Sequence, residues 1–149
     1  IYGYDDPKAK EYAESWGVFM QLINIIRDVS EDAKRDRIYL PLDDLARWGI
    51  SEEDVKSGEA LLEHPGWAPF VEEYLERADG YRQRAFKLLG HLDKSARYSP
   101  AAMASFYQSI MAKISKKKGD VFSERIQLSK TEKMLLAGYV YVRYRFFGF

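Results

Sequence analysis

The stretch QLINIIRDVSEDAKRDRIYLP, residues 21–41, sets a stripe of polar side chains into an otherwise apolar helix. At 100° per residue, four polar side chains fall within about 80° of arc, namely Gln21, Asn24, Asp28 and Asp32. The opposite side of the same helix is apolar and consists of Phe19, Leu22, Ile23, Ile26 and Val29. We therefore expect one face to pack in a core and the other to present oxygen atoms.

Asp28 and Asp32 stand one helical turn apart. Two carboxylates at this spacing repel each other by roughly a few tenths of a kcal/mol, so a neutralising cation explains their placement. Because the ligands are all oxygens, Mg²⁺ bridged to substrate phosphates suits them better than zinc. The alternative is a solvated acidic pair, which is common on helix surfaces.

The composition predicts one folded domain or part of one, since 46% of the 149 residues are hydrophobic. The absence of cysteine excludes disulfides and thiolate metal sites, and two histidines are too few for a zinc centre. No apolar run reaches the ~18 residues of a membrane span and no signal peptide opens the chain. These features predict a cytoplasmic protein.

The net charge is zero, but its sign is divided along the chain. Residues 1–65 hold 15 acidic and 8 basic residues, a net charge of −7, and residues 66–149 reverse these numbers. Two interpretations are open: the halves attract each other, or a cation site faces an anion-binding wall.

Apolar residues recur with a helical period over four long segments, which we predict to be helices at residues 7–34, 68–92, 100–116 and 129–145. Shorter helices are expected at residues 42–48 and after Ser51, which forms a capping box with Asp54. A second capping box, Ser129 with Glu132, opens the last helix. We predict a single all-α domain over residues 1–149. Because it begins with Ile1, we expect a piece of a longer protein.

Residues 12–41, YAESWGVFMQLINIIRDVSEDAKRDRIYLP, closely resemble the second aspartate-rich region of the squalene and phytoene synthase family. Members of this family show a helix reading Q-L-x-N-I-x-R-D-x-x-E-D, followed by G-R-x-Y-L-P. Three further segments also resemble the family, so that the likeness covers most of the chain: IYGYDD (1–6), FYQSIMAKI (106–114) and DVFSERIQLSKTEKM (120–134).

The resemblance implies an isoprenoid-synthase helical bundle, in which two aspartate motifs on facing helices hold Mg²⁺ ions that bind substrate diphosphates. Asp28 and Asp32 would be the metal ligands of the second motif, with Gln21 and Asn24 in the same pocket. The resemblance also assigns four further pocket residues, with Arg37 and Tyr39 beside the diphosphate and Tyr107 and Arg125 at C-terminal positions of the pocket.

Alternative interpretations apply to several of these residues. Tyr39 and Tyr107 are equally well explained as tyrosines packed between helices with a satisfied hydroxyl. Surface ion pairs are the alternative for a group of charged residues, which comprises Arg27, Glu31, Lys34, Arg35 and Arg125.

The chain departs from the family pattern in two places. Asp36 replaces the usual glycine before R-x-Y-L-P, where it would alter the loop backbone or bring a third carboxylate to the rim. The first aspartate motif is absent, since Asp43 and Asp44 are adjacent and Glu72, Glu73 and Glu76 follow a solvated pattern. The chain therefore resembles the C-terminal portion of a larger synthase domain whose N-terminal half is missing, and it carries half an active site.

The resemblance implies an Mg²⁺-dependent transferase that joins two farnesyl or geranylgeranyl diphosphates head to head through a cyclopropyl intermediate. The product would be of the squalene or phytoene type, and NADPH would be needed if it is squalene. The alternatives are a prenyl diphosphate phosphatase, a hydroxysqualene-type synthase, or a non-catalytic helical fragment.

The C-terminal segment GYVYVRYRFFGF, residues 138–149, is rich in aromatic and arginine residues. It suits either packing on the bundle or peripheral contact with a membrane surface. Nucleic acid is not an expected partner, because the charge is balanced and no binding motif occurs.

Overall fold

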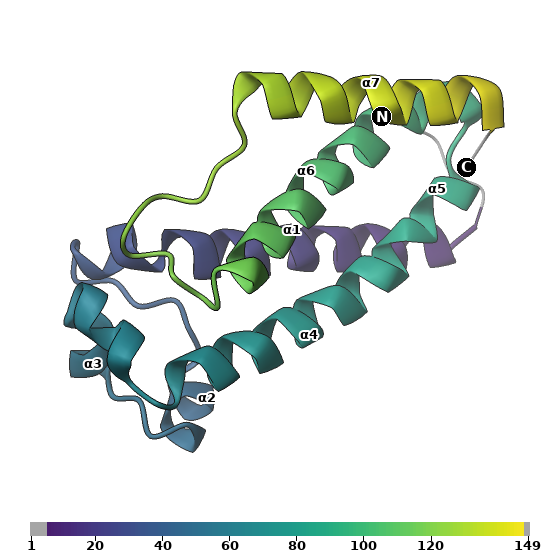
Figure 1. Cartoon of the computed structure of the whole chain (residues 1–149). Helices are drawn as coiled ribbons and strands as arrows, with labels where there is room; N and C mark the ends of the chain where they lie inside the picture. The colour runs from purple at the N-terminus through teal and green to yellow at the C-terminus, as the bar shows by residue number, and fades with distance from the viewer. Residues whose placement is uncertain (1–5, 148–149) are drawn as a thin grey trace.

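The structure, a computed structural model, describes residues 6–147, and every regular element in that range is a helix. Four long helices form a bundle (Figure 1): α1 (Lys8–Ala33), α4 (Trp67–Phe86), α6 (Tyr98–Lys116) and α7 (Lys130–Phe147). Short elements connect them: α2 (Leu42–Arg47), α3 (Glu52–Lys56), the 3₁₀ helix η1 (Gly58–Glu63), α5 (Leu88–His91) and the 3₁₀ helix η2 (Lys94–Ala96). The predicted all-α class with four long helices is confirmed.

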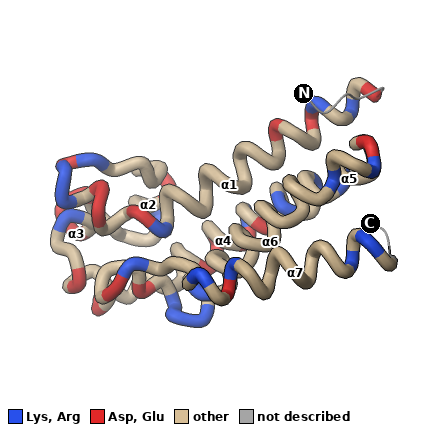
Figure 2. Tube along the Cα trace, turned by 90° about the horizontal axis from the view of Figure 1, so that it is seen from above, with Lys and Arg blue, Asp and Glu red and all other residues tan. Residues whose placement is uncertain are grey.

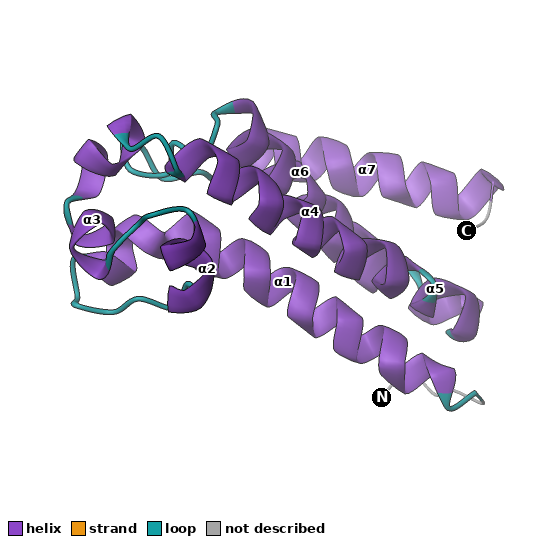
Figure 3. Cartoon of the chain, turned by 90° about the horizontal axis from the view of Figure 1, so that it is seen from below, coloured by secondary structure: helices purple, strands orange, loops and turns teal. Residues whose placement is uncertain are grey.

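The long helices pack side by side. α1 and α4 make the most extensive contact, α6 packs on both of them, and α7 packs on α6. The short helices α2 and α3 lie at one end of the bundle, while α5 lies at the other end beside the start of α1 (Figure 3).

The apolar face predicted for α1 is buried in the larger of two hydrophobic clusters. Phe19, Ile23 and Ile26 are almost completely inaccessible to solvent. They share this cluster with large side chains of α4, which include Trp67, Phe70, Val71 and Tyr74. A smaller cluster around Trp16, Ala85 and Leu89 lies toward the α5 end. Burial of one side of α1 leaves its polar stripe on the other side.

The end of α1 is closed by backbone hydrogen bonds that carry the following loop back onto the last turn. The amide of Arg37 donates to the carbonyl of Asp32 at 2.9 Å, and the amide of Asp36 donates to the carbonyl of Ala33 at 3.0 Å. Asp36 has φ +57°. This pattern is the Schellman motif, whose left-handed position is usually glycine, so the glycine of the family pattern has a structural reason. Aspartate tolerates this conformation better than most other residues.

The single helix expected over residues 68–92 is divided in two, because α4 ends at Phe86 and α5 begins at Leu88. Near the division the amides of Lys87 and Gly90 donate to carbonyls three residues earlier, those of Arg84 and Lys87. Such tighter turns leave the apolar period almost unchanged, which is why the sequence pattern continued through the division.

The segment after α6 is fixed onto the bundle, and it carries Arg125. The carbonyl oxygen of Gly119, which has φ +81°, accepts a hydrogen bond from Trp67 Nε1 at 3.0 Å. A Cβ at Gly119 would lie 2.7 Å from Val71 Cγ2, so only glycine fits this approach to α4. Farther along, Ile126 and Leu128 are buried. These anchors on either side set the position of Arg125.

Candidate functional site

The polar stripe of α1 lies at the surface of the bundle but is not fully solvated. Gln21 is exposed, whereas Asn24, Asp28 and Asp32 are half-buried. The Asp28 side chain keeps only 22% of its accessible surface. If the Asp28 carboxylate pointed into bulk solvent, a catalytic role for the polar stripe would be disfavoured. The Asp28 side chain does not point into bulk solvent.

Arg27 holds the Asp28 carboxylate from the neighbouring position on α1. Its Nε donates to Oδ1 at 2.8 Å and its Nη2 to Oδ2 at 2.5 Å. This two-point contact is the strong form of an arginine–carboxylate pair. Both side chains of the pair are half-buried, and that of Arg27 is 18% exposed. The contact fixes the orientation of the Asp28 carboxylate.

Arg125 reaches the same carboxylate from the segment between α6 and α7. Its Nη2 lies 3.4 Å from Asp28 Oδ1, and its Nη1 lies 3.3 Å from Glu31 Oε1. The structure thus brings together two predicted site residues that are 97 positions apart in the chain. Arg125 makes ion pairs, as its alternative interpretation expected, but one of them is with a predicted site carboxylate.

The arginines keep Asp28 ionised. Burial is the largest single influence on the pKa of Asp28 and would raise it, but the hydrogen bonds and charges of Arg27 and Arg125 together lower it below its ordinary value. In return, the hydrogen bond with Asp28 raises the pKa of Arg27. Asp28 is therefore an anion at neutral pH.

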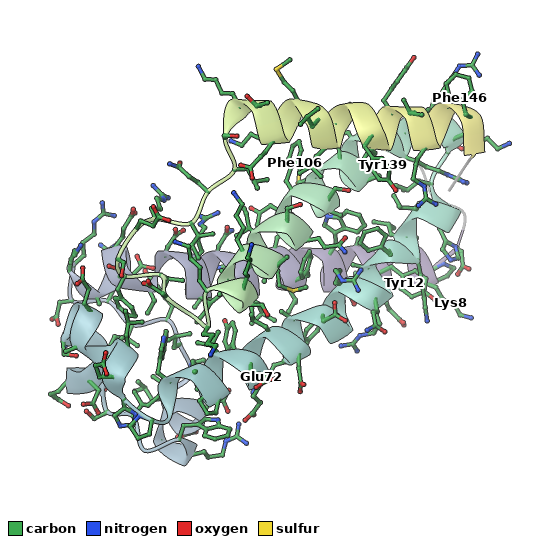
Figure 4. The ribbon with its side chains drawn as sticks, in the orientation of Figure 1. Lys8, Tyr12, Glu72, Phe106, Tyr139 and Phe146 are labelled. Carbon is green, nitrogen blue, oxygen red and sulfur yellow. The ribbon has the colours of Figure 1, made fainter. Side chains whose placement is uncertain are left out.

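Tyr107 lies beside this group on α6. Its ring makes an edge contact with Phe19 of α1, with 6.3 Å between the ring centroids. It also lies near enough to Arg27 to contribute to the raised pKa of that guanidinium. Its neighbour Phe106 lies below the N-terminal half of α7 (Figure 4). Tyr107 is thus half-buried where α6 packs on α1. This position agrees with both interpretations of Tyr107, a pocket residue and a tyrosine packed between helices.

Arg37 and Tyr39 lie on the loop that follows α1. The backbone of Arg37 is tied to Asp32 through the Schellman motif, but both side chains are exposed, and Tyr39 keeps 55% of its accessible surface. Among the described residues, no side-chain hydrogen bond joins either of them to Asp28 or Asp32. The structure therefore places them near the rim and does not bring them into the charged cluster.

Asp36 does not join the aspartates as a third carboxylate. Its Oδ1 lies 2.6 Å from the Nζ of Lys56 on α3. The hydrogen bond from Lys56 lowers the pKa of Asp36. The backbone of Asp36 has the left-handed conformation that glycine usually adopts at this position, so neither consequence expected for this departure from the family pattern is observed.

Asp28 and Asp32, the predicted metal ligands, are not joined by a third ligand in the described part of the chain. In the part of the chain that the structure describes, no three carboxylate or imidazole groups converge in a way that could hold a metal ion. Two carboxylates nevertheless fit Mg²⁺, because this ion usually keeps several waters and is bound through one or two carboxylates plus substrate phosphates. Within the described range Asp32 makes no ion pair, which leaves its charge uncompensated.

The acidic part of the sequence (residues 1–65) and the basic part (residues 66–149) form ion pairs with each other in the fold. Asp28, Glu31 and Asp44, from the acidic part, pair with Arg125 and Arg77 from the basic part. Figure 2 shows charged residues of both signs gathered at the end of the molecule that holds α2 and α3. Attraction between the two parts is thus present in the structure.

An open depression of about 560 Å³ lies between α4 and α6, away from the aspartates. Its lining includes Glu76 and Asp79 of α4 and Met111 of α6, and none of the predicted site residues. The depression is therefore separate from the polar stripe of α1.

The outer face of α7 is apolar. The helix packs inward through Val140, which is buried, and leaves an exposed set of large side chains: Met134, Leu135, Tyr139, Tyr141, Val142 and Phe146. Phe146, at the C-terminal end of α7 (Figure 4), is 71% exposed. Within residues 6–147 no helix combines the length and the apolar character needed to cross a membrane.

Comparison with known proteins gives one consistent match. A family-wide profile described as squalene/phytoene synthase matches residues 1–132. Phytoene synthase 2 of Zea mays is 37% identical over 127 residues, which are 85% of this chain and 31% of that protein. Phytoene synthase 1 of Arabidopsis thaliana is 33% identical over 145 residues, 93% of this chain and 34% of that protein. The names of both relatives describe them as chloroplastic.

The fold has a solved counterpart. A crystal structure of a dehydrosqualene synthase in complex with ligand superposes with a TM-score of 0.77 at 25% sequence identity. The match covers 90% of this chain and 46% of that structure. The chain thus spans about a third of the length of the relatives named above and a little under half of the solved structure.

Proposed function

The chain belongs to the squalene/phytoene synthase family, and on this basis we propose that it supplies one wall of an active site that joins two prenyl diphosphates head to head. The observation that carries the proposal is the charged cluster of α1, in which Arg125 lies against Asp28 while Asp32 has no cationic partner among the described residues. The resemblances at residues 12–41 and 120–134 therefore converge on one place in the fold.

We propose Mg²⁺ as the metal, with Asp28 and Asp32 as its ligands in this chain. When bound, Mg²⁺ would neutralise the diphosphate as the carbon–oxygen bond breaks, acting as a Lewis acid. Arg27 would orient Asp28, while Arg37 and Arg125 would contact diphosphate oxygens. Gln21, Asn24 and Tyr39 would complete the polar rim.

The apolar residues below the stripe would protect the allylic cation that forms when diphosphate leaves. Tyr107 lies near enough to Arg27 to influence its pKa, and its ring packs against Phe19 in the core below. Aromatic faces stabilise positive charge, and excluding water prevents hydrolysis of the reactive intermediate. Such protection would give a hydrocarbon product in place of the prenyl alcohol of the phosphatase alternative.

Among the possible products we propose a phytoene-type hydrocarbon, because the two plant relatives are named phytoene synthases. This product would need no NADPH, whereas a squalene-type product would need it. Because the relatives are chloroplast proteins by name, the cytoplasmic location expected from the sequence stays a prediction.

A chimera tests the proposed function. Residues 1–132 would replace the matched segment of the maize phytoene synthase 2, and the purified protein would be incubated with Mg²⁺ and geranylgeranyl diphosphate, with and without NADPH. A coupled hydrocarbon formed without NADPH is the expected product. A correctly folded chimera that releases only a prenyl alcohol would favour the phosphatase, and one that leaves the substrate intact would favour the non-catalytic fragment.

We also propose that the outer face of α7 rests on a membrane surface, where an apolar product would leave. The exposed apolar side chains are accompanied by four basic residues and one acidic residue in this helix, and anionic lipids attract such a charge. The test is co-sedimentation with vesicles of anionic and of neutral lipid. Leu135→Gln with Tyr139→Gln should abolish binding to anionic vesicles, and binding that survives both changes would contradict the proposal.

A further inference from the structure

Arg125 bridges two carboxylates of α1 with different nitrogens. Nη2 lies 3.4 Å from Asp28 Oδ1 and Nη1 lies 3.3 Å from Glu31 Oε1. Asp28 and Glu31 are three residues apart, so they are neighbours on the helix surface. One guanidinium thus counters two negative charges over one turn of α1.

The two arginines hold Asp28 unequally. Arg27 contacts both carboxylate oxygens at 2.8 and 2.5 Å and is 18% exposed. Arg125 shares only Oδ1, at a longer distance, and is 52% exposed. Exposed pairs of the second kind contribute little stability, so Arg125 is the partner that can be released from Asp28.

We propose that Arg125 is an internal counter-cation of Asp28, which a divalent cation displaces and which Glu31 then keeps beside the site. The inference rests on the proposed diphosphate site. Displacement would leave the guanidinium free for diphosphate oxygens at the moment when the metal arrives. Glu31, previously assigned only to a surface ion pair, thereby becomes a positioning residue that acts through Arg125.

If Arg125 competes with the metal for Asp28, removing Arg125 should raise the affinity for the metal. Binding of Mn²⁺ to the 149-residue chain is followed by the electron paramagnetic resonance signal of free Mn²⁺. Arg125→Gln should bind Mn²⁺ about two- to five-fold more tightly, since an exposed ion pair no longer competes. The same variant should bind pyrophosphate less tightly in the presence of Mn²⁺. These opposite directions are not expected from a merely structural arginine.

Arg35→Gln is the matched control, because it removes the same charge from an exposed residue near the same helix end. Equal tightening of Mn²⁺ binding by Arg35→Gln and Arg125→Gln would reduce the effect to general electrostatics and overturn the inference.

A double-mutant cycle isolates the role of Glu31. Glu31→Gln should weaken pyrophosphate binding in the otherwise unchanged chain and leave it unchanged when Arg125 is already Gln. An equal loss in both backgrounds would show that Glu31 does not act through Arg125.

Asp28→Asn separates the inference from the proposed function. If Mn²⁺ binding is absent from the starting chain or survives Asp28→Asn, the proposed metal site is wrong and the inference fails with it. If binding needs Asp28 but is unaffected by Arg125→Gln, the metal site stands and only the counter-cation role of Arg125 is overturned.

Discussion

Two clusters of carboxylates and arginines lie on this bundle, and they differ in one respect. In the cluster between α2 and α4, Asp44 pairs with Arg47 at 2.8 Å and with Arg77 at 2.7 Å. Glu73 pairs with Arg47 at 2.7 Å and also accepts a hydrogen bond from Trp48 Nε1 at 3.0 Å. Each of these two carboxylates therefore has more than one donor.

The cluster on α1 has three carboxylates for two arginines. Asp28 and Glu31 are countered by Arg27 and Arg125, whereas Asp32 has no ion pair with a described residue. Folding gains little from an unpaired carboxylate one turn from another. The first cluster is thus explained by stability alone, whereas the α1 cluster keeps a negative charge without a partner among the described residues, to which the proposed Mg²⁺ could bind.

The largest expected difference between the clusters is in catalysis. In the chimera with the maize enzyme, Asp32→Asn should lower turnover roughly 100- to 1,000-fold, the size of effect seen when one charge-stabilising group is lost from an active site. The matched change Asp44→Asn should leave turnover near that of the parent chimera. The measurement is the initial rate of product formation with geranylgeranyl diphosphate and Mg²⁺.

Circular dichroism of each variant serves as the folding control. Near-parental turnover for a folded Asp32→Asn chimera would remove the distinction between the two clusters and reject the assignment of Asp32 as a metal ligand.

The free energy of unfolding should be affected more by Asp44→Asn than by Asp32→Asn, the opposite of the order expected for turnover. Asp44→Asn should lower the free energy of unfolding by about 1–2 kcal/mol, because it weakens contacts with Arg47 and Arg77 that both involve charged groups. Asp32→Asn should change it by no more than about 0.5 kcal/mol, and relief of repulsion from Asp28 favours a gain. Urea unfolding of the 149-residue chain measures both values, and a larger loss for Asp32→Asn would indicate a structural partner for that side chain.

The helices were largely predictable because their signals are local. The predicted end of the first helix near Lys34 and both capping boxes, Ser51 with Asp54 and Ser129 with Glu132, are present in the structure. The polar stripe and the buried face of α1 were equally readable, since both follow from a period of 3.6 residues.

The partners within the site were less predictable because they depend on tertiary contacts. Nothing local links Arg125 to Asp28 across 97 positions. The pair of Arg27 with Asp28 was also missed, because adjacent residues on a helix do not normally face each other. Glu73 looked solvated by pattern but accepts hydrogen bonds from Arg47 and Trp48. The family resemblance selected Arg125 as a site residue where the local pattern could not.

The contribution of Asp44 to the stability of the fold should be lost at acidic pH. The hydrogen bond from Arg77, with the further contacts to Arg47, lowers the pKa of Asp44 below its ordinary value of 3.8. A lowered folded-state pKa contributes stability that is present above the unfolded-state pKa and is lost as the pH falls through the folded-state pKa. The difference in melting temperature between the unchanged chain and Asp44→Asn should therefore be constant above about pH 5 and shrink below pH 3.8. A difference that does not shrink as the pH falls below 3.8 would mean that Asp44 stabilises the fold by packing and not by its charge.

The smallest expected effect concerns Asp36, the carboxylate nearest in sequence to the α1 cluster that the structure assigns elsewhere. Its pairing with Lys56 at 2.6 Å separates it from Asp28 and Asp32. Asp36→Asn should leave Mn²⁺ affinity unchanged within error, whereas Asp32→Asn should weaken it. Asparagine suits this test because it also tolerates the left-handed conformation that Asp36 adopts at φ +57°, so the backbone turn is kept while the charge is removed. If Asp36→Asn weakened Mn²⁺ binding as strongly as Asp32→Asn, Asp36 would have to leave Lys56 and join Asp28 and Asp32 as a third metal ligand.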